Sequence, residues 1–426
     1  MRHVIIGNSA AGISAAETIR RLDPGCSITI ISDESYPAYS RCLLPELLAG
    51  DIGEDRLRIR HRDFYTRNNI ETKLGKKAIA VDTEMKQVAL ENGETVPYDK
   101  LLIATGSVTT FPPLEGMDLP GVFGLRTLGD AKKILETAGS ARRAVVVGAG
   151  LVGLEAAYAL YRRGLEVTVV EKAPQIVPQQ FDATASGILK KDMEAEGIRL
   201  VLDTGIRGII GPTLWERLFK RKGKGVVLEN GSRLKCELVV VATGARPNID
   251  IVKNTGIKVN RGIVVDNLMQ TGIPDIYAAG DVAETVEVVT GLRTITPIWP
   301  NAVAQGKFAG YNMAGREREY NGLIGMQNSV EFREEPAIAV GITQVNPKDY
   351  EILSVYRPEQ NVYKKLVIKD NVLKGMILVG DIAGAGVFSA LIRTKTNIGQ
   401  IKHQLLRDDF SYGYFLRKAV QGLHAS

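Results

Sequence analysis

The chain has 426 residues, a formal net charge of +6, 45% hydrophobic and 24% charged residues. This length predicts two or three domains, and the composition is ordinary for a soluble α/β enzyme. No apolar run approaches the ~18 residues of a membrane span, and a strand pattern over residues 4–6 leaves no room for a signal peptide, which favours the cytoplasm. Three scattered cysteines argue against a disulfide framework, and no Cys/His spacing is typical of a metal site.

The first strand pattern runs into a glycine-rich segment that is typical of a dinucleotide-binding turn. It reads Val4-Ile5-Ile6-Gly7-Asn8-Ser9-Ala10-Ala11-Gly12 and leads into a helix-like run. Glycines at such a turn let the backbone approach a pyrophosphate at a helix amino terminus, although tight packing is the alternative interpretation. Ser9 replaces the middle glycine, which narrows that approach. A second strand pattern over 27–31 is followed by Asp33, the best candidate for a ribose acceptor.

Two further segments carry charge or a nucleophile. The stretch Ala38-Tyr39-Ser40-Arg41-Cys42-Leu43-Leu44-Pro45-Glu46 places Cys42 beside Arg41, which would favour a thiolate if the cysteine is reactive. The alternative is an inert, small, buried residue. Basic residues then crowd one region, namely Arg56, Arg58, Arg60, His61 and Arg62, and a second group resembles a hairpin tip, Lys220-Arg221-Lys222 with Lys224. Both are typical of a solvated face, and the lack of interleaved aromatics speaks against nucleic acid.

The rest of the chain predicts the domain order. Two buried-strand patterns end in Ala-Thr-Gly, at Ala104-Thr105-Gly106 and at Ala242-Thr243-Gly244, and their glycines let the chain pass close to a nucleotide. Residues 111–124 are rich in proline and glycine and predict a linker. We therefore expect one domain from 1–110 and 238–320, a second domain inserted at 111–237, and a separate α+β domain over 321–426.

A second glycine-rich segment lies in the expected insertion. It reads Val145-Val146-Val147-Gly148-Ala149-Gly150-Leu151-Val152-Gly153-Leu154-Glu155, and a strand pattern over 166–170 follows and ends on Glu171. A carboxylate there accepts hydrogen bonds from both ribose hydroxyls and repels a 2′-phosphate, which favours NADH over NADPH. Lys172 weakens that preference.

The order of these motifs, completed by Ile276-Tyr277-Ala278-Ala279-Gly280-Asp281, resembles the pyridine nucleotide-disulfide oxidoreductases over essentially the full length. The resemblance implies an α/β fold with two three-layer, Rossmann-like dinucleotide-binding domains and a carboxy-terminal α+β interface domain. It also implies FAD in the discontinuous domain, NAD(P)H in the inserted domain, and a homodimer.

The family pattern also implies roles for individual residues. Toward FAD, the glycine-rich turn would hold the pyrophosphate, Asp33 the ribose, the Ala78 backbone the adenine, Arg126 the phosphates or flavin, Asp281 the ribityl chain and the Trp299 backbone the pyrimidine. The other expected FAD contacts are Gly7, Ser9, Ala10, Ala11, Gly12, Arg41, Ala104, Thr105, Gly106, Thr243, Gly244 and Gly280. Toward the nicotinamide dinucleotide, Glu155 would lie near the nicotinamide and Glu171 at the ribose, with the loop residues Gly148, Gly150, Leu151, Val152 and Gly153.

The electron acceptor stays open between two branches of the family. Leucine at position 47 excludes the paired cysteines of glutathione-reductase-like members, whereas a single Cys42 resembles coenzyme A-disulfide reductases and NADH oxidases or peroxidases. Tyr39-Ser40-Arg41 resembles NADH:rubredoxin and ferredoxin reductases and the flavin part of NADH nitrite reductases. The histidine of the oxidases is replaced by Ala10 and Ala11, and the Pro-Pro stretch of the coenzyme A enzymes is missing.

These features predict an NADH-dependent FAD oxidoreductase that passes electrons to a small acidic iron-sulfur protein of the ferredoxin or rubredoxin type. The catalytic candidates are Cys42, Arg41 and Glu155. The alternative is a thiol-dependent reductase or NADH oxidase in which Cys42 acts on a disulfide such as that of coenzyme A, on polysulfide, on peroxide or on oxygen. A flavin-bearing module that senses the nucleotide state is a third, non-enzymatic hypothesis.

Overall fold

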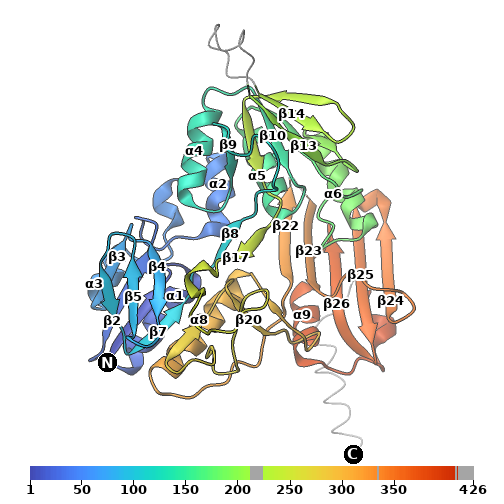
Figure 1. The fold of residues 1–426 in the computed structure, drawn as a ribbon. Coiled ribbons are helices and arrows are strands. Elements are labelled where there is room, and N and C mark those ends of the chain that lie inside the picture. The colour runs from blue at the N-terminus through green and yellow to red at the C-terminus, as the bar shows by residue number, and fades with distance from the viewer. Residues whose placement is uncertain (212–223, 333–334, 408–409, 411–426) are drawn as a thin grey trace, which may run out of the picture. The chain divides into compact units, whose positions relative to one another are not determined.

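The computed structural model describes residues 1–211, 224–332, 335–407 and 410. The chain forms two compact units, each assembled from two stretches of sequence (Figure 1). Unit 1 contains Met1–Ala141 and Val240–Gly325, and unit 2 contains Arg142–Val239 and Met326–Ser426. The basic segment at 220–222 and the helical pattern at 415–420 lie outside the described residues.

Unit 1 is built on a parallel sheet with the strand order β19-β7-β1-β2-β3. Its strands are β19 (Ile276–Ala278), β7 (Lys100–Ile103), β1 (Arg2–Ile6), β2 (Ser27–Ser32) and β3 (Ile70–Leu74). All four neighbouring pairs are parallel. The chain proceeds outward from β1 on both sides, so the carboxyl end of β1 is a topological switch point, where open α/β sheets bind their ligands.

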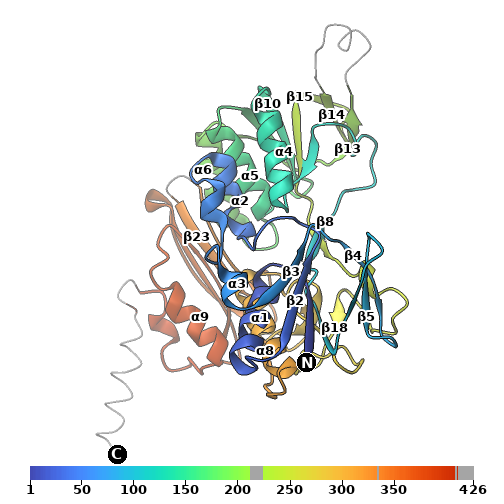
Figure 2. The same cartoon turned by 90° about the vertical axis from the view of Figure 1, so that its left-hand side faces the viewer.

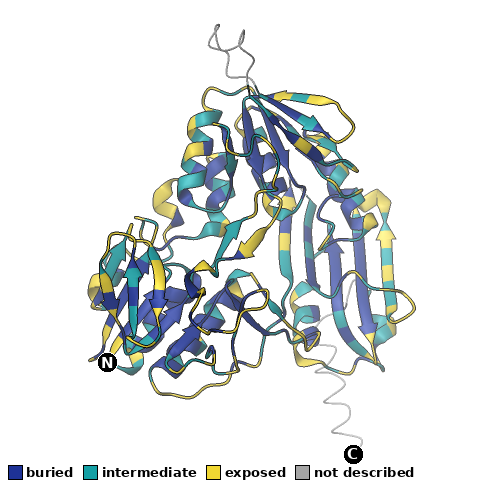
Figure 3. Ribbon diagram, in the orientation of Figure 1, coloured by how far each residue is buried: buried dark blue, intermediate teal, exposed yellow. Residues whose placement is uncertain are grey.

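Two helices with small residues at their contact cover one face of this sheet. In Figure 2, α1 (Ala10–Leu22) and α8 (Trp299–Met313) lie side by side, and the antiparallel strands β4 (Ala78–Asp82), β5 (Gln87–Leu90) and β6 (Thr95–Pro97) lie on the other face. A Cβ atom on Gly306 of α8 would lie 2.1 Å from the carbonyl oxygen of Ala11 in α1. The close approach of these helices therefore requires glycine, and the sheet between the layers is buried (Figure 3).

The remaining segments of unit 1 surround this core. The stretch after β2 forms η1 (Arg41–Leu43), α2 (Leu44–Ala49), η2 (Glu54–Leu57) and α3 (Phe64–Arg67). Each Ala-Thr-Gly segment leads into a short strand, β8 (Ser107–Thr109) or β17 (Ala245–Pro247), and these two strands pair with each other. Further elements are β9 (Val122–Gly124), α4 (Leu128–Ala138), η3 (Asp250–Val252) and the sheet of β18 (Ile263–Val264), β20 (Ala283–Val286) and β21 (Arg293–Ile295).

Unit 2 contains a second sheet, in which the strands β12, β11, β10 and β16 are neighbours in this order. They are β12 (Arg199–Val201), β11 (Glu166–Val170), β10 (Arg143–Val147) and β16 (Leu238–Val241), accompanied by α5 (Leu151–Arg162) and α6 (Ala183–Ala195). A small antiparallel sheet of β13 (Ile206–Ile210), β14 (Lys224–Leu228) and β15 (Arg233–Cys236) is added to it.

The carboxy-terminal part of unit 2 is an antiparallel sheet with the order β22-β23-β26-β25-β24. Its strands are β22 (Gln327–Phe332), β23 (Glu335–Gly341), β24 (Glu351–Arg357), β25 (Val362–Lys369) and β26 (Val372–Val379). They are accompanied by η4 (Pro358–Gln360), α9 (Ala385–Thr394), which packs on β26, and η5 (Lys402–Gln404). Within the described part of the chain, no helix is long and apolar enough to cross a membrane.

Candidate cofactor sites

A cavity of about 510 Å³ opens in unit 1 at the carboxyl ends of β1, β2, β7 and β19. Its volume lies in the ordinary range of ligand and cofactor sites. Residues from eight separate stretches of sequence meet there. The predicted FAD residues that line it are Gly7, Ser9, Ala10, Ala11, Asp33, Arg41, Ala78, Ala104, Thr105, Gly106, Arg126, Gly280, Asp281 and Trp299, and the candidate Cys42 lines it as well.

Three predicted FAD residues of unit 1 do not line this cavity. Gly12 lies inside α1, where a Cβ atom would be 2.0 Å from the carbonyl oxygen of Gly7, so this glycine serves close packing. Thr243 and Gly244 form the turn before β17. The Thr243 hydroxyl donates to the carbonyl of Thr110, and the Thr110 N–H donates to the carbonyl of Gly244.

The glycine-rich turn after β1 provides an anion cradle at the cavity. Gly7 has φ +127°, which L-residues rarely adopt, and a Cβ atom there would lie 2.1 Å from the Ala104 carbonyl oxygen. Ser9 is the N-cap of α1, and its side chain makes no capping hydrogen bond. The positive end of the helix dipole and the N–H groups of its first turn therefore meet the cavity, as a pyrophosphate requires.

A hydrogen-bonded group around Asp281 forms one wall of the cavity. The Arg126 guanidinium donates to Asp281 Oδ2 at 2.5 Å, and the Ser107 hydroxyl donates to the same oxygen at 2.8 Å. Arg126 Nε also donates to the Ser107 carbonyl at 3.3 Å. Ser107, which directly follows Ala-Thr-Gly, is a site residue that sequence reasoning missed.

A second polar group involves Glu34, Tyr39 and Arg41. Arg41 donates to Glu34 Oε1 at 2.5 Å and to the Arg126 carbonyl at 2.7 Å, and the Tyr39 hydroxyl donates to Glu34 Oε2 at 2.7 Å. Burial is the main reason that the pKa of Tyr39 is raised, so its hydroxyl stays protonated and can donate. Tyr39 and Arg41 of the aromatic-x-Arg motif therefore both donate to the carboxylate of Glu34. Glu34 is a site residue that sequence reasoning missed when it selected the neighbouring Asp33.

Cys42 differs from the other two cysteines in its surroundings. It is exposed on η1 and lines the cavity, whereas Cys26 and Cys236 are buried. Burial raises the pKa of the Cys236 thiol to about 12, which makes it a poor nucleophile. Cys42 is therefore not the buried residue that the alternative interpretation assumes, and its reactivity stays a prediction.

The second glycine-rich turn, in unit 2, donates a backbone N–H group to the side chain of Glu171. Gly148 has φ +106°, and a Cβ atom on Gly150, the N-cap of α5, would meet nothing within 4 Å. Glu171 accepts from the N–H of Ala149 at 2.7 Å and from that of Ala173 at 2.8 Å. The predicted ribose acceptor thus also fixes the loop, and an open cradle at a helix amino terminus fits a dinucleotide.

The other candidates of this half lie on α5. Leu151, Val152, Gly153 and Glu155 all belong to the first turns of this helix; Val152 is 45% exposed and Glu155 is half-buried. A residue that the sequence did not single out, Val177, completes the loop. It has φ +42° and its N–H donates to the Ala149 carbonyl at 2.8 Å.

These two cradles, each at the end of a parallel strand and each in its own unit, define a protein that binds two dinucleotides. Comparison with known families agrees with this class. Residues 1–306 match the model described as pyridine nucleotide-disulphide oxidoreductase, and residues 337–396 match the rubredoxin NAD+ reductase C-terminal domain. The chain belongs to the pyridine nucleotide-disulphide oxidoreductase family.

Individual relatives extend over most of the chain. It is 35% identical over 382 residues to the assimilatory nitrate reductase electron transfer subunit of Bacillus subtilis (strain 168), covering 89% of this chain and 48% of that protein. It therefore spans about half the length of this curated relative. It is 32% identical over 418 residues to the NADH-dependent phenylglyoxylate dehydrogenase subunit epsilon of Aromatoleum evansii, covering 97% and 96% of the two chains.

Among solved structures, an NAD-dependent persulfide reductase from A. fulgidus superposes with a TM-score of 0.87 at 30% identity, covering 97% of this chain and 80% of that one. The resemblance drawn from the motifs is confirmed, and so are the fold class and an FAD-dependent NAD(P)H oxidoreductase as the class of enzyme. FAD and a nicotinamide dinucleotide are the cofactors of this family. The roles assigned to individual site residues stay predictions.

Proposed function

We propose that this protein oxidises NADH and delivers the electrons to a small acidic iron-sulfur protein of the rubredoxin or ferredoxin type. The observation that carries this proposal is the match of residues 337–396 to the rubredoxin NAD+ reductase C-terminal domain. Two relatives are named as an electron transfer subunit and as a subunit of an NADH-dependent dehydrogenase, which supports a protein as the acceptor. A homodimer and a preference for NADH over NADPH belong to the same proposal.

FAD, when bound, accepts a hydride from NADH and can release electrons one at a time. The chain's residues would hold it in the unit 1 cavity, with the turn after β1 at the pyrophosphate and Asp281 at the ribityl hydroxyls. Glu171 and the turn after β10 would hold the NADH. The protein's part in this reaction is to orient the two cofactors and exclude competing acceptors.

A basic surface beside the cavity is the proposed docking site for the carrier. The backbone of Arg58 pairs with that of Tyr39, which lines the cavity, and the Ser40 N–H donates to the Leu57 carbonyl at 2.8 Å. Arg56, Arg58 and Arg62 are exposed. A negatively charged partner on these arginines would therefore stand next to the wall of the FAD cavity.

Arg60 has a different role from its neighbours. It donates two hydrogen bonds to Glu17, at 2.6 and 2.7 Å, and thereby ties the segment to α1. Reversing its charge would disturb the fold, so the test of docking uses the exposed arginines.

The experiment compares Arg58→Glu and Arg62→Glu with Arg316→Glu, which makes the same charge change on another exposed loop of unit 1. At low salt we expect reduction of an acidic rubredoxin to slow about tenfold in the first two variants, because steering by opposite charge is lost. The difference should shrink as salt screens the charges. NADH oxidation with ferricyanide should be unchanged, and equal rubredoxin rates in all three variants would contradict the docking site.

Exposure of Cys42 at the same cavity supports a second candidate function, a thiol-dependent reductase. The persulfide reductase among the structural relatives favours this chemistry. Its test is turnover with coenzyme A disulfide or polysulfide by Cys42→Ser, with Cys236→Ser as the buried control. Loss of this turnover in Cys42→Ser alone would establish the thiol reaction, and full retention would exclude it.

A further inference from the structure

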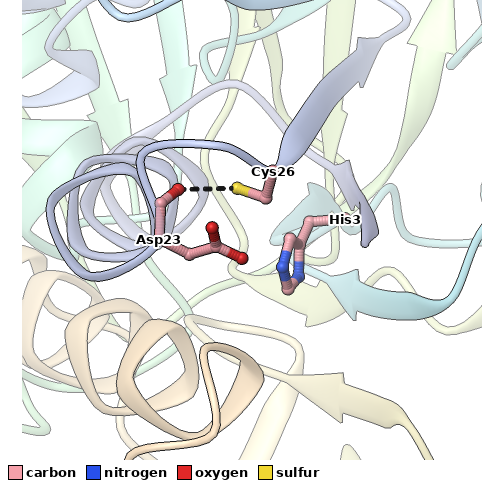
Figure 4. Close-up of side chains that lie close together, drawn as sticks. All are labelled: His3, Asp23 and Cys26. Atoms are coloured by element: carbon pink, nitrogen blue, oxygen red, sulfur yellow. Dashed lines mark hydrogen bonds between the residues drawn. The ribbon is translucent and has the colours of Figure 1, made fainter.

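Three potential metal ligands meet at the amino-terminal end of β1, away from the FAD cavity. His3 lies in β1, Asp23 is the C-cap of α1, and Cys26 directly precedes β2. Their ligand atoms lie within 4.8 Å of one another, and Figure 4 shows the three side chains turned toward one common space. Positions 3, 23 and 26 match no metal motif, because the fold and not the spacing brings them together.

The burial of the His3 imidazole and the lack of hydrogen bonds from the described residues to its ring nitrogens distinguish this cluster. The residue is 1% exposed, yet neither ring nitrogen has a hydrogen-bond partner in the described part of the chain. Buried polar atoms are nearly always satisfied, so two on one ring call for a ligand. Burial also lowers the pKa of His3 to about 4, which keeps the ring neutral and able to coordinate.

We propose that His3, Asp23 and Cys26 bind one divalent cation of the zinc class. Zinc takes imidazole nitrogen, thiolate and carboxylate in a tetrahedral arrangement, with ligands at ~2.0–2.3 Å, so small inward shifts of these side chains complete the site. One thiolate and one carboxylate neutralise the two charges of the metal, and the soft sulfur favours zinc over magnesium or calcium. Asp23 is only half-buried, which leaves access for a water molecule as the fourth ligand.

Burial raises the pKa of the Cys26 thiol, whereas the neighbouring Arg20 lowers it and so favours the thiolate that a metal would bind. The Arg20 guanidinium donates to the carbonyls of Pro24 and Cys26 at 2.8 and 2.9 Å and lies 3.8 Å from Cys26 Sγ. Without metal, the Cys26 thiol donates to the Asp23 carbonyl at 3.1 Å. On binding, the S–H bond breaks, its proton leaves to solvent, and the sulfur bonds the metal. The Arg20 guanidinium beside the sulfur would then stabilise its negative charge.

Positive groups near the site oppose the binding of a cation, and negative groups favour it. Lys100 is paired in register with His3 across β1 and β7, and the amino terminus and Arg20 add positive charge. Asp99 and Asp23 act in the opposite direction. Binding therefore depends on ionisation of Cys26, and affinity should rise with pH. The cation would join the start of β1 to the turn before β2 and so stabilise unit 1, apart from any chemistry at the cavity.

The test uses the full-length flavoprotein, freed of metal with a chelator and titrated with Zn²⁺ or Co²⁺. We expect one ion per chain, a thiolate-to-cobalt absorption band and a rise in Tm. Cys26→Ser and His3→Gln should bind about 100-fold more weakly or not at all, because a ligand is lost. Cys236→Ser, which changes a buried cysteine elsewhere, should bind like the wild type.

Two controls keep the outcome decisive. FAD content reports whether each variant folds, and Asp23→Asn, at the half-buried ligand, replaces any variant that does not. The cobalt band must persist in Cys42→Ser, since an exposed thiol can bind metal by itself. Absence of stoichiometric binding by the wild type, or binding that survives in both Cys26→Ser and His3→Gln, would overturn the proposal.

Discussion

The two glycine-rich turns share a first glycine with a positive φ, +127° at Gly7 and +106° at Gly148, but differ at the middle position, where Ser9 stands in the first turn and Gly150 in the second. In the turn after β1, Gly7 and Gly12 are required by packing, because Cβ atoms there would lie 2.1 and 2.0 Å from backbone oxygens. In the turn after β10, a Cβ atom on Gly150, the position that corresponds to Ser9, would meet nothing within 4 Å. The outer glycines of the first turn are thus fixed by packing, whereas the middle position of the second turn leaves open space at the helix amino terminus.

The acidic residues that follow the two turns, Asp33 and Glu171, differ in the contacts that they make. Glu171 holds the backbone N–H of Ala149, while Asp33 is exposed at the edge of its cavity. The shared motif therefore predicts the strand–turn–helix fold, but it does not predict which contacts stabilise the turn. In addition to the backbone hydrogen bond from its first glycine, which both turns make, the second turn donates the Ala149 N–H to the side chain of Glu171.

The largest difference is expected between Gly7→Ala and Gly150→Ala. Alanine at position 7 combines a strained φ of +127° with overlap on the Ala104 carbonyl, so we expect a loss of about 4 kcal/mol in the free energy of unfolding. At position 150 φ is an ordinary −75°, and the loss should be about 1 kcal/mol or less. Urea unfolding of both variants measures this contrast, and similar losses would remove the distinction between the packed first position and the open middle position of the motif.

The same two variants should differ in cofactor binding as well as in stability. Gly150→Ala should fold and keep its FAD but raise the KM for NADH, because the new methyl group occupies the open cradle. Gly7→Ala should be isolated with little FAD. A Gly150→Ala enzyme with an unchanged KM for NADH would show that the cradle of unit 2 is not where the pyrophosphate binds.

Most of the regular structure could be predicted from the sequence, since it follows from local patterns. The strand expected at 166–170 is β11 itself. The helix before it, α5, ends at Arg162, close to Gly164, which adopts φ +86°. The cradle of unit 1 was also predictable, because its glycines and Asp281 belong to motifs.

The contacts that complete the sites could not be predicted in the same way. Ser107 and Asp281 are 174 residues apart, and Glu34 meets Arg41 only after the chain turns back at η1. Val177 is held in a conformation that β-branched residues avoid, so its type gives no hint of its place at the Ala149 loop. Such contacts are made by tertiary structure, and no spacing in the chain records them.

An intermediate effect is expected for Glu171→Gln, which sharpens the comparison of the acidic residues. The amide oxygen can still accept from Ala149, but without the charge the hydrogen bonds to the loop and to a ribose weaken by about 1.4 kcal/mol. We expect the KM for NADH to rise about tenfold and the preference over NADPH to narrow. Steady-state kinetics with both nucleotides measures this, and Glu166→Gln, on the exposed start of the same strand, serves as the control. An unchanged nucleotide preference would leave Glu171 with only its role in the loop.

The smallest effect is expected where the first turn departs from the motif, at Ser9. Its extended backbone does not require glycine, and its hydroxyl caps nothing in α1 although it lines the cavity. Ser9→Gly should therefore change the free energy of unfolding by only about 0.3 kcal/mol. If the hydroxyl donates to a phosphate oxygen of FAD, Ser9→Gly and Ser9→Ala should both weaken FAD binding about fivefold, the value of one hydrogen bond. If the side chain instead narrows the approach to the pyrophosphate, Ser9→Gly should bind FAD more tightly than Ser9→Ala, so the ratio of the two dissociation constants decides between the two roles.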